Sequence, residues 1–310
     1  MNLLHLTYAV EVARLGSIRK AADALFIAQP NLSRAIKELE ADLGIPIFNR
    51  SFKGMEPTPD GEEFIGYAKR ILSQIDEVEH LYRDKGKRPA PQKFSISVPR
   101  ASYIAHAFAR FSRMINADTA EIYYNETNSS HTISNVLSGE YNLGIVRYAK
   151  KFDVYFKNMF LEKELLNQVI RNFHYVLIMH GQSSLASQKV IHLADLNPYI
   201  EIAHADPFVP SLIFSTIKRE ELPDTIKRRI FVFERGSQFE LLSHNQKTFM
   251  WVSPVPGELL GRYGLVQREC VDNTKEYEDV LIYRKGYHLS KLDRQFFSVL
   301  GQVNDPPLEE

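Results

Sequence analysis

The sequence predicts a protein of the α/β class, in which a small, mainly helical N-terminal part precedes a larger part made of two α/β lobes. Three observations lead to this prediction. Apolar residues recur at helical spacing through about the first 45 residues. A long helical pattern follows and ends in the charged, proline-containing stretch DKGKRPAPQK. Beyond residue 94, short β-rich segments alternate with helical ones, which is typical of parallel sheets with right-handed crossovers.

Length and composition limit the class of protein. A chain of 310 residues with 44% apolar and 25% charged residues has the composition of a globular protein of two or three domains. Basic and acidic residues number 38 each, so any affinity for nucleic acid must arise from local charge. The single Cys270 excludes an intrachain disulfide and fits a reducing compartment. The N-terminus lacks a basic leader and no apolar run could cross a bilayer, so we expect a cytoplasmic protein with no membrane partner.

The N-terminal part is expected to form three helices and a hairpin. Gly16 suits the end of a first helix, and Ser17 can cap a second, short one. A third helix should carry Pro30 in its first turn and end at Gly44, and residues 47–57 then form two extended arms. The predicted core residues share helical spacing: Leu6, Val10, Ala13, Ala21, Ala22, Leu25, Leu32, Ile36, Leu39 and Leu43.

The third helix carries polar residues between its apolar positions. In a helix-turn-helix the second helix lies in the major groove, where Gln and Asn can pair with adenine, and Arg and Lys with guanine. Residues 14–53 hold seven basic and four acidic side chains, so this region is locally positive. The predicted DNA-binding residues are Gln29, Pro30, Asn31, Ser33, Arg34, Lys37, Arg50 and Lys53. An ordinary solvated amphipathic helix is the alternative that the pattern leaves open.

A long helix is expected to follow Thr58, a good N-cap, and Pro59. Its apolar residues alternate steps of four and three over about two and a half heptads. These predicted dimerisation residues are Phe64, Ala68, Ile71, Ile75, Val78 and Tyr82. They could pack against the helix's own domain or against a second copy of the chain. We favour the second copy, because the pattern continues beyond the length that a small domain could cover.

Four segments are predicted from these patterns. They are a DNA-binding domain (1–58), a dimerisation helix (59–83), a hinge (84–93) and the two α/β lobes (94–310). The expected strands of the lobes lie at 94–98, 120–125, 142–146, 174–179, 199–203, 230–233, 249–253 and 279–283.

Residues 1–65 resemble the winged helix-turn-helix of LysR-type transcriptional regulators. The stretches that carry the resemblance are GSIRKAADALF at 16–26, AQPNLSRAIKELEADLGIPIFNR at 28–50 and TPDGEEF at 58–64. The long helix, the hinge and the two lobes follow in the family's order, so the resemblance extends over the whole chain. It implies that a periplasmic-binding-protein-like effector domain follows the winged helix-turn-helix. Ala28 and Pro57 depart from the capping and apolar residues that are usual in the family.

The resemblance also implies partners. They are double-stranded DNA with a pseudo-palindromic operator, further copies of the chain in a homodimer or homotetramer, and a small-molecule effector; the family also allows RNA polymerase. Helix N-termini at a sheet's switch point favour anions, so an anion is one option for the effector. The predicted effector-binding residues are Arg100, Ser102, Asn128, Ser129, Ser130, Arg147 and His204. The stretch 239–254 lacks the glycine-rich turn that is usual in the family's second lobe.

No enzyme is expected. The chain contains no GxSxG, GxxxxGK[ST], HExxH or GxGxxG motif, and its ten histidines lack metal-ligand spacing, so we expect neither cofactor nor metal. An exported solute-binding protein is a closer rival, but such a protein would carry a signal peptide and would not need about ninety residues for reading DNA. The remaining alternative is a ligand-independent DNA-binding regulator whose C-terminal part serves in oligomerisation or partner binding.

Overall fold

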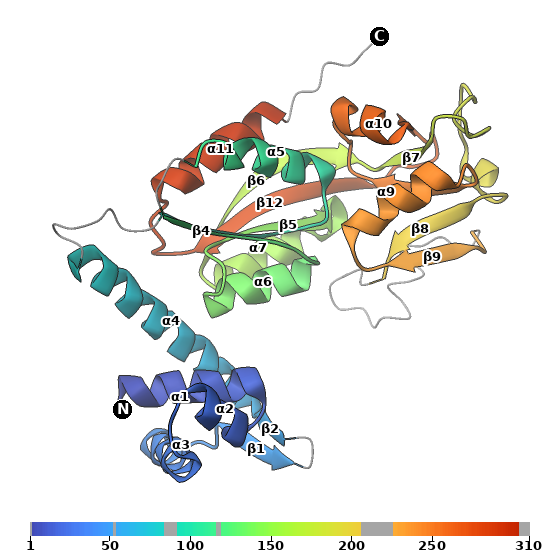
Figure 1. Cartoon of the computed structure of the whole chain (residues 1–310). Helices are drawn as coiled ribbons and strands as arrows, with labels where there is room; N and C mark the ends of the chain where they lie inside the picture. The colour runs from blue at the N-terminus through green and yellow to red at the C-terminus, as the bar shows by residue number, and fades with distance from the viewer. Residues whose placement is uncertain (1, 52–53, 84–91, 116–118, 206–225, 304–310) are drawn as a thin grey trace. The chain divides into compact units, whose positions relative to one another are not determined.

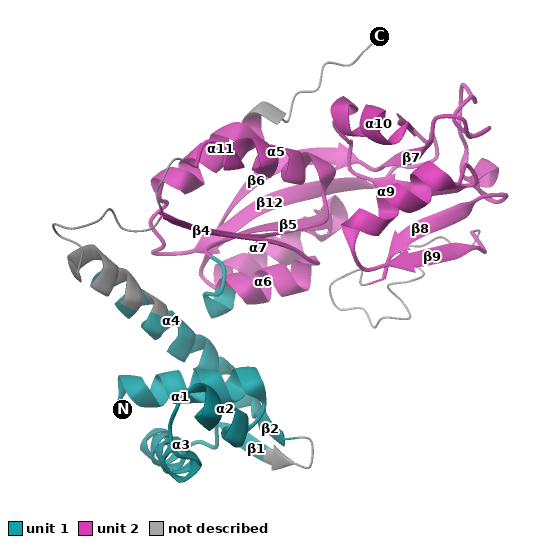
Figure 2. Cartoon of the chain, in the orientation of Figure 1, with its two compact units in different colours: residues 1–91, 137–141 teal, residues 92–136, 142–310 magenta. Residues whose placement is uncertain are grey.

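The computed structural model describes residues 2–51, 54–83, 92–115, 119–205 and 226–303 (Figure 1). Its contacts divide the chain into two compact units, residues 1–91 with 137–141 and residues 92–136 with 142–310 (Figure 2). Most of the predicted hinge, residues 84–91, lies outside the described residues, and its last two residues already belong to strand β3.

The first unit contains three short helices, a hairpin and a long helix. In chain order they are α1 (Leu3–Leu15), α2 (Ile18–Ala24), α3 (Gln29–Leu43), β1 (Phe48–Ser51), β2 (Gly54–Pro57) and α4 (Pro59–Arg83). Gly16 and Gly44 end α1 and α3 in the left-handed conformation, at φ 62° and 71°. The Ser17 side chain accepts a hydrogen bond from the Lys20 amide at the start of α2. The helix ends predicted from the sequence are therefore confirmed.

The core of this unit differs slightly from the predicted one. Ala21, Ala22, Leu32, Ile36 and Leu39 are buried as predicted, and so is Leu6, but the other buried residues of α1 are Ala9 and Val12. The predicted core residues Val10, Ala13, Leu25 and Leu43 are only half-buried at its margin. Helix α1 packs against α2, α3 and α4 together, so its covered face is wider and turned relative to the single stripe that the sequence suggested.

The beginning of α4 is fixed by the Thr-x-x-Gly stretch. The Thr58 hydroxyl donates to the Pro46 carbonyl at 2.7 Å and accepts from the Gly61 amide at 2.9 Å, so Thr58 caps the helix as predicted. A Cβ added at Gly61 would lie 2.0 Å from the Ile47 carbonyl oxygen. Glycine is therefore required here, because the first turn of α4 lies directly against the backbone that leads into β1.

The apolar residues of α4 differ in how far their own unit buries them. Ala68 is fully buried in the core of its own unit, and Phe64 and Ile71 pack against that same core. For Ala68 the prediction of a dimer contact is therefore corrected, because α4 lies along α1 and uses this part of its stripe internally. Farther along, Ile75 is half-buried and Val78 is 54% exposed. Tyr82 lies on the helix, but its side chain is outside the described residues.

The second unit contains two five-stranded sheets, which define two lobes. Lobe 1 has the strand order β4-β3-β5-β12-β6, and lobe 2 has the order β11-β7-β10-β8-β9. The strands of lobe 1 are β3 (Gln92–Val98), β4 (Ala120–Glu126), β5 (Leu143–Ala149), β6 (Leu165–His174) and β12 (Glu276–Arg284). Those of lobe 2 are β7 (Val176–His180), β8 (Ile200–His204), β9 (Arg229–Val232), β10 (Thr248–Val252) and β11 (Leu265–Arg268).

Helices cover both lobes. Lobe 1 carries α5 (Ser102–Ser112), α6 (Ser129–Ser138), α7 (Asp153–Glu162) and α11 (Lys291–Val303), and lobe 2 carries α9 (Arg235–His244) and α10 (Gly257–Tyr263). In lobe 1, Phe94 of β3 packs against Phe111 of α5 and Phe296 of α11, with ring centroids 4.8 and 5.4 Å apart. Helices α5 and α11 thus cover one face of the lobe 1 sheet with a single aromatic core.

Both sheets are mixed, whereas the sequence predicted parallel ones. Strand β12 is antiparallel to β5 and β6, and β7 is antiparallel to β10 and β11. The single strand predicted at 174–179 is divided, because β6 ends at His174 and β7 begins at Val176 in the other lobe. Strand β6 was not predicted, since most of its side chains are exposed at a sheet edge and form no apolar run.

The chain passes twice between the lobes, at Tyr175 between β6 and β7 and at residues 269–275 between β11 and β12. The two crossovers are bonded to each other. The Asn273 side chain donates to the Tyr175 carbonyl at 2.8 Å, and the rings of Tyr175 and Tyr277 lie 4.2 Å apart. The lobes are therefore joined along one side, where β6, β12, β7 and β11 meet.

Candidate DNA-binding surface and effector site

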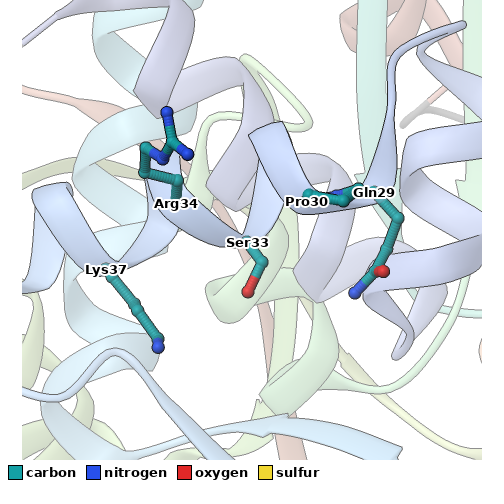
Figure 3. A pocket seen from close by; sticks show the side chains of 5 residues that line it. All are labelled: Gln29, Pro30, Ser33, Arg34 and Lys37. Carbon is teal, nitrogen blue, oxygen red and sulfur yellow. The ribbon is translucent and has the colours of Figure 1, made fainter.

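Helix α3 is divided into a buried and an exposed side. Leu32, Ala35, Ile36 and Leu39 anchor it in the core of the first unit. On the other side a shallow hollow is lined by Gln29, Pro30, Ser33, Arg34 and Lys37, which Figure 3 shows along the helix. Five of the eight residues predicted to bind DNA thus line one surface.

The polar side chains of α3 that were predicted to bind DNA are not used by the fold, including Asn31, which does not line the hollow. Gln29, Asn31, Arg34 and Lys37 are exposed and Ser33 is half-buried. Within the described residues, none of these five side chains takes part in a hydrogen bond or an ion pair with another side chain or the backbone. Donors and acceptors held on a rigid helix, with no internal partner, are available for base edges and phosphates.

The entry to α3 reflects the departure at Ala28. Ala28 is extended, at φ −68° and ψ 131°, and offers no side-chain cap to the first amides of the helix. Pro30 in the first turn removes one of the amides that would need a partner. The helix therefore begins at Gln29 without a hydroxyl cap from the residue before it. The predicted DNA-binding residues Gln29, Ser33 and Arg34 still line the hollow.

The β1–β2 hairpin is held in a fixed place beside α3. The Glu40 carboxylate of α3 accepts from the Ile47 and Phe48 amides at 2.8 and 3.1 Å. Gly54, at φ 122°, approaches the Gly16 carbonyl so closely that an added Cβ would lie 2.4 Å from its oxygen. Gly54 was predicted as part of the turn between the two extended arms. The role of Glu40 was not predicted, although an acidic residue near the end of α3 is a usable signal for such a bond to the following strand. Arg50 lies on β1 with its side chain outside the described residues, and Lys53 lies outside them altogether.

Comparison with known proteins agrees with this geometry. Residues 3–62 match the family model described as bacterial regulatory helix-turn-helix protein, lysR family. The chain carries a LysR-family helix-turn-helix domain. The matched residues include α1 to α3, the hairpin and the first turn of α4, so the recognition made from the three quoted stretches is confirmed.

Known transcriptional regulators align with only part of this chain. The regulator BenM of Acinetobacter baylyi is 46% identical over 78 residues, which are 25% of this chain and 26% of BenM. YofA of Bacillus subtilis, an HTH-type transcriptional regulator, is 32% identical over 143 residues, 44% of this chain and 50% of YofA. The aligned part therefore spans between about a quarter and a half of these relatives' length.

Solved structures of LysR-type regulators share the complete fold. Full-length OxyR from Pseudomonas aeruginosa aligns with a TM-score of 0.61 at 17% identity, covering 98% of this chain and 94% of that one. The LysR family regulator CbnR aligns with a TM-score of 0.58 at 18% identity, covering 99% and 100%. The predicted fold class, a winged helix-turn-helix followed by a two-lobed α/β domain, is thus confirmed.

Several residues predicted to bind an effector lie together in lobe 1, but the fold already uses them. Ser129, at the start of α6, is 6% exposed. Its hydroxyl donates to the Arg147 carbonyl at 2.6 Å and accepts from the Arg147 amide at 3.1 Å, so it joins α6 to β5. The Asn128 side chain accepts from the His131 amide at 2.9 Å and caps α6. Ser130 is exposed beside them.

The Arg147 side chain is bound to a carboxylate of the same lobe. Its Nε and one terminal nitrogen donate to Asp279 at 2.8 and 2.6 Å, and Tyr103 donates to Asp279 at 2.5 Å. The guanidinium also lies over the Phe173 ring, at 4.7 Å. Burial alone would lower the pKa of Arg147, but the Asp279 carboxylate outweighs this effect and raises it, so the side chain stays charged. Asp279 was missed from the sequence, although an acidic residue opening the apolar run VLIY is a signal for such a buried pair.

The remaining predicted effector residues are more scattered. Ser102 opens α5 and is buried, and Arg100 is half-buried just before it. His204 ends β8 in lobe 2 and is half-buried. Within the ranges that the structure describes, no group of three or more His, Cys, Asp and Glu could hold a metal ion. A search of those same ranges finds no helix with the length and hydropathy to cross a membrane.

Proposed function

We propose that this chain is a DNA-binding transcription regulator that reads a pseudo-palindromic operator as a homo-oligomer. The observation that carries the proposal is that the five polar side chains of α3 predicted to bind DNA have no partner within the described residues. The LysR-family match over residues 3–62 supports the same role, and so does the full-length fold that the chain shares with CbnR. Such a regulator acts where the DNA is, in the cytoplasm, and the proposal includes no catalytic step.

We expect two copies of the chain to pair through the part of α4 around Ile75 and Val78. Ala68 is buried in the core of its own unit, but Ile75 is only half-buried, and Val78 is 54% exposed. A second copy that covers these side chains would place two α3 helices on two half-sites, as operator symmetry requires. Further pairing of the second units would give a tetramer.

The second unit would sense a small molecule held between its two lobes. The N-termini of α5 and α6 lie at the carboxyl ends of β3 and β4, where α/β sheets bind ligands. A ligand changes operator binding only if it favours one arrangement of the oligomer over another. The sensing step therefore requires lobes that can move relative to each other.

Titration of operator DNA tests the proposal directly. The purified chain should bind one fragment from its own chromosomal neighbourhood far more tightly than a scrambled fragment of equal length. Specific sites are typically preferred by about 10³-fold or more over non-specific DNA. Equal affinity for specific and scrambled fragments at moderate ionic strength would contradict it.

A regulator without an effector is the second candidate. It is favoured by the internal use of Ser129 and Arg147, which leaves fewer polar groups in lobe 1 for a ligand. In that case the second unit would serve in oligomerisation or in binding a partner such as RNA polymerase. A footprint that stays the same with and without extracts of small metabolites would support this candidate, and an altered footprint would refute it.

A further inference from the structure

The two lobes meet at a second place, remote from their crossovers. Both crossovers leave from one side of each sheet, where β6 and β12 lie in lobe 1 and β11 and β7 lie in lobe 2. The opposite edge is formed by β4 in lobe 1 and by β9 in lobe 2. Helix α9 follows β9 after two residues, so its first turn belongs to this far edge.

An ion pair joins the lobes at this far edge. Arg235 is the first residue of α9, and Glu126 is the last residue of β4. The Arg235 Nε lies 2.8 Å from a Glu126 carboxylate oxygen, and the two side chains are only 23% and 17% exposed. An ion pair between residues of two different sheets can fix the spacing of the lobes only while the pair is intact.

The partners of the ion pair are themselves held in place by their own lobes. Tyr124 donates to the second Glu126 oxygen at 3.1 Å, and the Tyr124 ring stacks on Phe108 at 4.3 Å. Burial and the Glu126 carboxylate raise the pKa of Tyr124, so its hydroxyl keeps the proton that it donates. On the other side the Arg235 guanidinium lies 6.0 Å from the Phe239 ring of α9.

We infer that Glu126 and Arg235 form a clasp that holds the lobes in one arrangement and must open for the lobes to separate. On one side of the two lobes, the crossovers and the bonds between them act as the hinge. On the opposite side, the clasp holds the edge of lobe 1 to the edge of lobe 2. For its consequence the inference rests on the proposed effector-controlled function, because a ligand between the lobes would enter or leave when the clasp opens. Glu126 and Arg235 are thus positioning residues, and they act through the spacing of the lobes.

The clasp can be tested without knowing any ligand, by measuring distances between spin labels in the full chain. Cysteines replace the exposed Tyr123 of β4 and Glu240 of α9, one in each lobe. Cys270 is 5% exposed and burial raises the pKa of its thiol, so it should stay unlabelled. Dilution with unlabelled protein restricts the measured pairs to labels within one chain.

The expected result is one narrow distance distribution in the parent chain. Glu126→Gln and Arg235→Gln should each broaden it toward longer distances, and the charge exchange Glu126→Arg with Arg235→Glu should narrow it again. Lys157→Gln, which breaks an ion pair with Asp153 inside lobe 1, is the matched control and should change nothing.

An unchanged distribution in both single variants would overturn the clasp, and so would a charge exchange that gives no recovery although the variant folds. Operator binding is measured on the same samples. If the single variants keep the narrow distance distribution of the parent and still bind the operator, the inference of a clasp is wrong and the proposed function stands. If the parent chain ignores its operator, the proposed function fails, whatever the distances show.

Discussion

Helix α3 and the lobe 1 residues around Ser129 and Arg147 were both predicted to bind a partner, DNA in one case and an effector in the other. They differ in whether the fold already satisfies their polar side chains. On α3, the five polar side chains predicted to bind DNA (Gln29, Asn31, Ser33, Arg34 and Lys37) have no partner within the described residues. In lobe 1, Ser129 is bonded to the Arg147 backbone, and the Arg147 side chain is bonded to Asp279. A polar group that the fold leaves unsatisfied at the surface is available to a partner, whereas one that is satisfied inside mainly stabilises the fold.

The largest expected effect is a loss of stability when the buried pair of Asp279 and Arg147 is broken. Asp279→Ala leaves the buried Arg147 guanidinium without its carboxylate, and removing one partner of a buried pair costs about 3–5 kcal/mol. The loss should appear in the midpoint of denaturant unfolding of the second unit. Glu276→Ala, which breaks the exposed ion pair with Lys150, should leave that midpoint nearly unchanged. If both variants unfold alike, Asp279 does not stabilise the lobe in this way.

The next effect concerns affinity for DNA. Arg34→Ala should weaken operator binding by about 10- to 100-fold per subunit, because a bidentate contact to guanine contributes roughly 1–3 kcal/mol. Stability should not change, since Arg34 is exposed. Fluorescence anisotropy and circular dichroism measure the two properties, with Arg262→Ala in the second unit as the control. Undiminished operator affinity in Arg34→Ala would remove α3 as the reading helix.

A smaller effect is expected on assembly. Ile75→Asp with Val78→Asp should shift sedimentation toward the monomer, because two carboxylates would be placed in an apolar contact. The substitutions avoid Ala68, whose replacement would disturb the core of its own unit. Gln74→Asp, on an exposed position of the same helix, is the matched control. An unchanged sedimentation coefficient for the double variant would mean that the copies pair elsewhere.

The smallest effect is a change in how stability depends on pH. Glu278 is 5% exposed, and burial, together with the Asp153 carboxylate, raises its pKa above the usual 4.5. The folded chain thus binds this proton more tightly than the unfolded chain, so stability falls as pH rises from 4.5 through the raised pKa.

Glu278→Gln imitates the protonated carboxyl. It should raise the melting temperature at neutral pH by about 1–3 °C and leave it unchanged well below pH 4.5. Thermal unfolding over a series of buffers measures the difference. A variant that is less stable than the parent at neutral pH would show that the Glu278 charge is stabilising.

The sequence predicts the first unit better than the second, for physical reasons. Helix caps such as Ser17 and Gly44 are local, and the exposed side of α3 follows from its periodicity. The partners of Arg147 are not local, since Asp279 lies 132 residues away in the sequence. Periodicity also does not show which neighbour covers the apolar residues of a helix. Ala68 was therefore predicted to contact a second copy of the chain, although it is buried in its own unit, where α4 packs against α1.

Base recognition by α3 is tested most sharply by changing single atoms of the DNA. Each guanine of the operator is replaced in turn by 7-deazaguanine, which lacks the N7 acceptor that arginine reads in the major groove. The parent chain should lose affinity at one position in each half-site, and Arg34→Ala should show no further loss there. Equal losses in the parent and in Arg34→Ala at every position would contradict base reading by this helix.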